Sequence, residues 1–118
     1  MKTPQKTDPR PPLSLSGAAR KLWASIRDEY DIRDSGGLAV LTVACEAFDR
    51  MREAREVLAR EGLVISNHRG ELRAHPCTAI ERDSRGQMLS AIRQLGLDLQ
   101  PVHERVGRPA GLSKFRVV

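Results

Sequence analysis

Histidines and cysteines are the residues of this chain that could bind a metal ion. His68, His75 and Cys77 fall within one short stretch, while Cys45 and His103 lie farther away. Zinc sites repeat closely spaced ligand pairs, whereas His75 and Cys77 flank a proline and no second pair follows. We therefore predict surface or helix-capping histidines, and neither a bound metal nor a metal-dependent nuclease.

Glycines that precede helices can bind phosphate groups. Ser16-Gly17 and Ser35-Gly36-Gly37 each stand before an expected helix, but neither belongs to the GxxxxGK[ST] pattern that holds nucleotide phosphates. The sequence predicts a protein that is not an enzyme and that has no cofactor.

Basic side chains provide the remaining chemistry, which is contact with phosphate. The 118 residues carry 20 Lys and Arg against 15 Asp and Glu, a net charge of +5. Residues 1–16 contribute +2 and residues 107–118 contribute +3, while residues 17–106 hold 14 basic and 14 acidic side chains. Both ends are rich in Pro or Gly, so we expect flexible basic arms at residues 1–15 and 107–118.

Such arms suit salt-dependent phosphate contact of low sequence specificity, although they could also serve only solubility. The predicted DNA-binding residues lie in the arms, on the first helix and on the last one. They are Lys2, Lys6, Arg10, Arg20, Lys21, Arg82, Arg85, Arg108, Lys114 and Arg116.

Between the arms, residues 16–106 are expected to form one mainly α-helical domain. Apolar residues at steps of three and four predict a helix over residues 16–30, with Trp23 on its buried side. A turn follows, in which Asp34 or Ser35 is placed to cap a second helix over residues 37–61 that ends at Gly62.

The second helix has two distinct halves. Residues 38–45 are apolar on all sides, so we expect protein to surround them. Six residues at alternating steps of four and three lie in one line along this helix, and the alanines among them allow a second helix to approach closely. We predict that this line is an oligomer interface, with packing inside one protomer as the alternative. Its members are Val40, Ala44, Ala47, Met51, Ala54 and Leu58.

The C-terminal half of the domain begins with two short β-prone stretches around Asn67-His68-Arg69-Gly70, which predict a small hairpin. Thr78 and Glu81 have the spacing of a capping box, so a third helix should begin at Thr78 and end at Gly96. A short helix or turn is expected over residues 101–106.

This order of features resembles the small terminase subunit of tailed bacteriophages, in its compact form. The resemblance covers residues 13–106 and depends on Trp23, an acid before the long helix, Gly62, His75-Pro76, and Leu95-Gly96-Leu97 before Pro101 and Arg105. It implies a homo-oligomeric ring, commonly of eight or more subunits, that binds double-stranded viral DNA. The ring hands this DNA to the large terminase subunit, which is the motor ATPase and nuclease.

Two other functions fit the same sequence. One is a small dimeric DNA-binding regulator, and the other is a helical scaffold for protein partners that does not bind DNA. Reading of the major groove by the second helix is disfavoured, because residues 38–41 at its start are apolar. The chain has no apolar run of membrane-spanning length, so we expect no membrane contact. The resemblance implies a location in the cytoplasm of the bacterial host.

Overall fold

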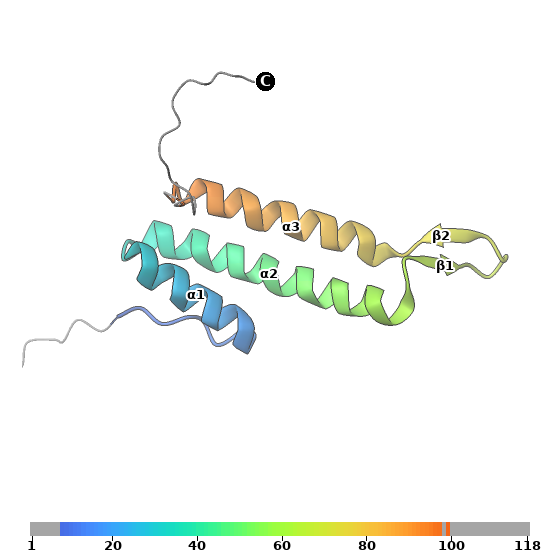
Figure 1. Ribbon diagram of the computed structural model, residues 1–118, viewed down its shortest axis with the longest axis horizontal. Helices are drawn as coiled ribbons and strands as arrows, with labels where there is room; N and C mark the ends of the chain where they lie inside the picture. The colour runs from blue at the N-terminus through green and yellow to red at the C-terminus, as the bar shows by residue number, and fades with distance from the viewer. Residues whose placement is uncertain (1–7, 98, 100–118) are drawn as a thin grey trace, which may run out of the picture.

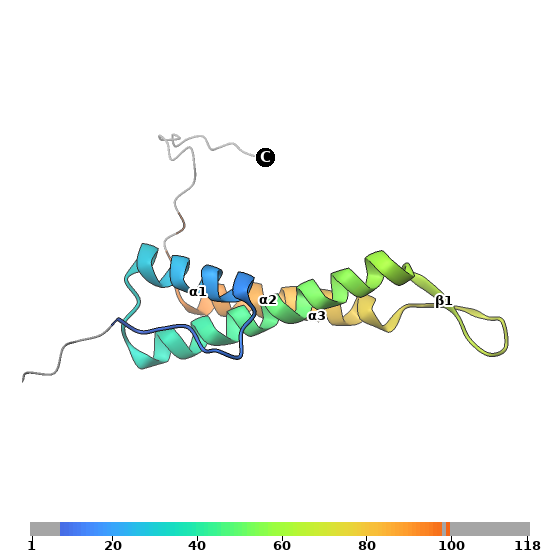
Figure 2. The same cartoon turned by 90° about the horizontal axis from the view of Figure 1, so that it is seen from below.

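The computed structural model describes residues 8–97 and 99, and shows three helices and one β-hairpin. The long α2 and α3 run antiparallel side by side, and the short α1 packs against the first half of α2 (Figure 1). The hairpin joins α2 to α3 and extends beyond the end of both helices (Figure 2). The predicted mainly helical fold, with a long central helix and a hairpin before the third helix, is confirmed.

Helix α1 spans Gly17–Tyr30, and Ser16 caps its start. The Ser16 hydroxyl accepts a hydrogen bond from the Ala19 amide at 3.1 Å. The Ser16 amide donates to the Asp49 carboxylate at 2.9 Å, which connects the start of α1 to α2. Trp23 is buried, and its indole N–H donates to the Thr42 hydroxyl at 3.1 Å.

Helix α2 spans Ser35–Glu61, and Asp34 is its N-cap, as one of the two predicted candidates. The Asp34 carboxylate accepts from the Gly37 amide at 2.7 Å. A Cβ atom at Gly37 would lie 2.9 Å from Asp34 Oδ1 and 2.9 Å from Ile32 Cγ2, so this turn requires glycine. The helix ends at Gly62, as predicted, where φ is 89°.

The α2–α3 contact forms the centre of the protomer. Ala44, Ala47, Met51 and Ala54 on α2 are buried, and Ser84 and Ala91 are buried on α3, which spans Pro76–Gln94. These four residues of α2 belong to the line predicted as an oligomer interface; Val40 and Leu58, at its two ends, are half-buried.

That line is therefore packed within one protomer, which is the alternative that the sequence left open. Small side chains let two backbones approach closely, and the same spacing serves packing within a chain or between chains. In this protomer the four buried residues of the line are covered by its own helices, whereas Val40 and Leu58 stay partly open to a second copy.

The hairpin pairs β1 (Val64–Ser66) with β2 (Leu72–Ala74) in antiparallel register. Ile65 is half-buried, and the other five strand residues are exposed. Asn67 organises the turn: its side-chain oxygen accepts from the Arg69 amide at 2.8 Å and from the Glu71 amide at 3.0 Å.

The start of α3 differs from the prediction, because the cap is His75 and not Thr78. The Cys77 amide donates to His75 Nδ1 at 3.0 Å, so the ring carries its proton on Nε2, 2.8 Å from Glu61 Oε1. Pro76 fits the first helical position, and Thr78 already lies inside the helix, where its hydroxyl donates to the His75 carbonyl. The capping-box prediction was wrong in detail, whereas the prediction of a capping histidine is confirmed.

The N-terminal segment over residues 8–15 lies along α1. Leu15 is buried, Pro11 and Pro12 are half-buried, and the Arg27 guanidinium donates to the Pro9 carbonyl. The folded part thus extends N-terminal to the domain boundary predicted at residue 16. Most of the predicted arm, the predicted turn over residues 101–106 and the C-terminal tail lie outside the described residues.

Replacement of His75 by Ala should destabilise the protomer by about 1–2 kcal/mol, because it removes the cap of α3 and the contact to Glu61. Urea unfolding followed by circular dichroism at fixed protein concentration measures this loss. The control is His68→Ala, since His68 is exposed in the hairpin turn and should change stability by less than about 0.5 kcal/mol. Equal effects of the two substitutions would contradict the capping role.

Candidate nucleic-acid interface

The described residues include five of the ten predicted DNA-binding side chains. Lys2, Lys6, Arg108, Lys114 and Arg116 lie outside the described part of the chain. The other five occupy three places: Arg10 on the segment beside α1, Arg20 and Lys21 on α1, and Arg82 and Arg85 on α3. The structure does not bring these five into one patch.

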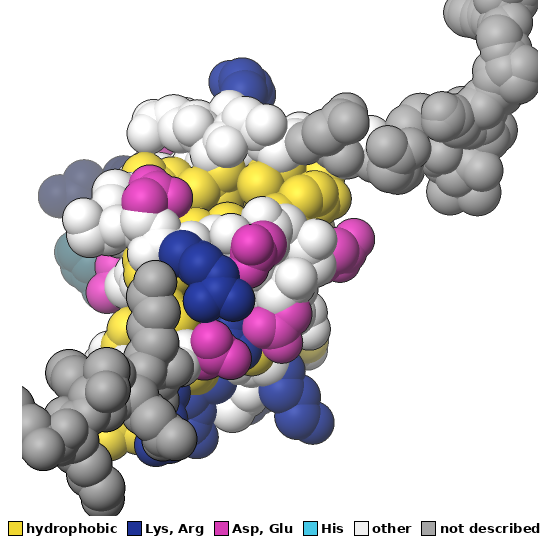
Figure 3. Space-filling view, turned by 90° about the vertical axis from the view of Figure 1, so that its left-hand side faces the viewer, with side chains coloured by type: hydrophobic (Ala, Val, Ile, Leu, Met, Phe, Trp, Pro, Cys, Tyr) yellow, Lys and Arg dark blue, Asp and Glu magenta, His cyan; other side chains and the backbone are white. Residues whose placement is uncertain are grey.

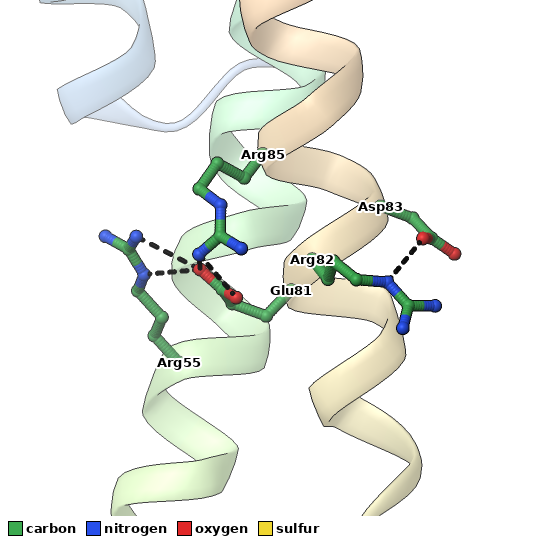
Figure 4. A network of polar contacts seen from close by, with 5 residues as sticks. All are labelled: Arg55, Glu81, Arg82, Asp83 and Arg85. Atoms are coloured by element: carbon green, nitrogen blue, oxygen red, sulfur yellow. Dashed lines mark hydrogen bonds and ion pairs between the residues drawn. The ribbon is translucent and has the colours of Figure 1, made fainter.

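Arg82 and Arg85 are both paired with acids of the protomer. Arg85 lies 3.1 Å from Glu81, one turn before it on α3, and Arg55 of α2 reaches the same carboxylate at 3.0 Å (Figure 4). Arg82 contacts Asp83 at 3.2 Å on the other side of α3. Carboxylates held this close reduce the attraction of both arginines for phosphate.

The cations near the N-terminus differ in this respect. Arg10 and Lys21 are exposed and Arg20 is half-buried. Within residues 8–97, none of the three has an ion-pair partner. Among the predicted residues of the described part, these are the ones available to phosphate.

The hairpin carries two cations that sequence reasoning missed. Arg69 lies in the turn and Arg73 in β2, both are exposed, and neither forms an ion pair within the described part of the chain. Glu71 is the acid between them, and its carboxylate accepts a hydrogen bond from the side-chain amide of Asn67 at 2.8 Å. One arginine inside the Asn67–Gly70 turn and another in the β-prone stretch after it were the sequence signal for these cations.

Charge on the folded part is mixed in sign. Residues 8–97 hold 14 basic and 13 acidic side chains. At the end of the bundle where α2 begins, basic and acidic side chains alternate around exposed hydrophobic ones (Figure 3). A surface of mixed sign offers no concentrated basic patch for phosphate.

Groups that could do chemistry are sparse in the described part. No three His, Cys, Asp or Glu side chains within it are placed to bind a metal ion. Burial, with a smaller contribution from Asp49, raises the pKa of the Cys45 thiol to about 11, so this group stays protonated and acts in packing. Among the helices described, none is long and apolar enough to cross a membrane.

The described part is thus a small helical protein with mixed surface charge. A comparison with protein families is more specific, since the family described as "Phage terminase, small subunit" matches residues 19–103. The chain belongs to this family, and the resemblance noted in the sequence is confirmed. Neither the curated proteins nor the solved structures gave a match. Small terminase subunits are adaptors in phage DNA packaging.

Removal of two positive charges from α1 should weaken DNA binding more than removal of two positive charges from α3. Arg20→Gln with Lys21→Gln should lower affinity and flatten the slope of log affinity against log salt by up to about two units. Arg82→Gln with Arg85→Gln, the matched control, should change both less in samples whose mass by light scattering equals that of the wild type, because Asp83 and Glu81 already offset these charges. Fluorescence anisotropy with a labelled duplex at several salt concentrations measures both quantities. A larger loss from the α3 pair would contradict this ranking.

Proposed function

We propose that this protein acts in phage DNA packaging as a ring that binds double-stranded viral DNA and presents it to the large terminase subunit. Family membership over residues 19–103 is the observation that carries the proposal. The ring, the DNA contact and the transfer to the large subunit are the specific parts of the proposal. In this role the protein works in the host cytoplasm, without a cofactor and without catalysis of its own.

The charge distribution supports a contact made largely by the ends of the chain. Residues 8–97 are nearly neutral, so most of the net charge of +5 belongs to residues outside this range. One protomer would bind DNA weakly through such contacts. Several protomers on one duplex would bind with much higher affinity, since every contact after the first is intramolecular.

Removal of the ends tests the DNA contact. Deletion of residues 1–7 removes Lys2 and Lys6 but leaves the segment that packs on α1, and deletion of residues 107–118 removes Arg108, Lys114 and Arg116. Each deletion should lower DNA affinity and flatten its salt dependence, because fewer phosphates are neutralised. Anisotropy titrations measure the affinity, and circular dichroism and light scattering check that helix content and assembly persist.

The outcome of this experiment also separates the alternative functions. A doubly truncated protein that keeps the full salt slope would move the DNA contact to α1 or the hairpin. A full-length protein with no affinity for DNA would favour the protein scaffold. A dimer that binds one short operator tightly would favour the regulator.

A further inference from the structure

A groove lies between α2 and α3 at the end of the bundle where α2 begins. Its volume is about 770 Å³, and both helices contribute to its walls. Ala39 and Val43 line the α2 side, and Gly86, Ser90 and Gln94 line the α3 side. The small residues Ala39, Gly86 and Ser90 would let a protruding side chain of a partner approach both backbones closely. Arg82, Asp83 and Gln87 add charged and polar groups to the α3 side of the groove.

The groove lies over a side of α2 that is left exposed in the protomer. Leu41 and Cys45 are buried in the cluster with Ala19 and Trp23 of α1. Val43 lies between them in sequence, about 200° around the helix from each, and is 48% exposed. The expectation that protein surrounds residues 38–45 is therefore met on the sides facing α1 and α3 but not on the groove side.

The same protomer carries a protruding ridge on another side of α3. Arg85, Leu89 and Arg93 recur every four residues and form one stripe along the helix. None of the three lines the groove, and Leu89 is 52% exposed. A large apolar side chain between two cations is thus presented to solvent.

Charge on the two surfaces is complementary. Glu81 lies between the guanidinium groups of Arg55 and Arg85, so this cluster keeps one net positive charge beside the stripe. On the groove side, Glu46 follows Val43 by one turn of α2, is exposed, and has no ion-pair partner within residues 8–97. If the α3 of a second copy runs antiparallel to this α2, as in a ring whose axis follows the bundle, Leu89 placed over Val43 brings Arg85 toward Glu46.

We propose that the groove receives the Arg85–Leu89–Arg93 stripe of a second copy of this chain. The two surfaces differ, so the contact is head to tail: each copy offers a ridge to one neighbour and a groove to the other. Contacts of this kind generate closed rings when the rotation between copies closes. This inference rests on the proposed ring and identifies the residues that would hold it together.

Engineered disulfides test the pairing in the full-length chain with Cys77→Ser. A double variant, Val43→Cys with Leu89→Cys, should form a ladder of cross-linked species beyond the dimer on a non-reducing denaturing gel. Each single variant should form no cross-link, because a head-to-tail contact places Val43 beside Leu89 and not beside another Val43. Disulfide dimers from Val43→Cys alone would overturn the proposal, since they require two grooves to face each other.

Mass measurement by light scattering provides an independent readout. Val43→Glu should reduce the assembly to smaller species and keep the helical circular dichroism, because a charge at this half-exposed position is not buried in the protomer. The matched control is Leu72→Glu on the hairpin, which is 75% exposed and should keep the wild-type mass.

The two proposals fail in different ways. A multimeric wild-type protein that neither cross-links between Val43→Cys and Leu89→Cys nor responds to Val43→Glu would overturn this interface and leave the ring standing. A monomeric wild-type protein would contradict the ring of the proposed function as well.

Discussion

The close approach of α2 and α3 is the constraint on which the rest of the structure depends. It is made possible by small buried side chains on both helices: Ala44, Ala47 and Ala54 on α2, and Ser84 and Ala91 on α3. A larger residue at these positions would force the helices apart by overpacking. The contact fixes the level of one helix against the other, so that Arg55 meets Glu81 and Arg50 meets Gln87 across the pair.

Other features follow from that register. The end of α2 brings Glu61 to the buried ring of His75, which closes the connection between the hairpin and α3. The hydrogen bond from His75 lowers the pKa of Glu61, so the Glu61 carboxylate is ionised at neutral pH and accepts this hydrogen bond. Because α3 occupies one side of α2, α1 packs on a second side at Leu41 and Cys45, and the third side remains as the groove.

Much of the fold could be predicted from the sequence, because local signals determined it. Apolar spacing gave the three helices, Asp34 and Gly62 marked the ends of α2, and the Asn67–Gly70 turn marked the hairpin. The start of α3 could not be predicted in detail. The capping role of His75 depends on Glu61, fourteen residues away, and Glu81 is drawn to Arg55 of another helix.

The functional surfaces were harder to predict from the sequence, because they too depend on contacts between residues that are distant in the chain. A line of alanines has the same spacing whether its partner is in the same chain or in a second one, and the structure shows burial within the protomer. The sequence predicted that Arg82 and Arg85 contact DNA, yet the fold places each of them beside a carboxylate. The family was nevertheless recognisable, since it depends on the order of short motifs along the chain and not on contacts between them.

The central claim is that this small terminase subunit works as a closed ring of many copies. Native mass spectrometry of the full-length protein, across protein concentrations, counts those copies directly. We expect a single stoichiometry well above two that persists on dilution, because a closed ring has no exposed groove to which further copies add. A monomer or dimer at every concentration, or an open series of sizes that grows with concentration, would contradict the claim.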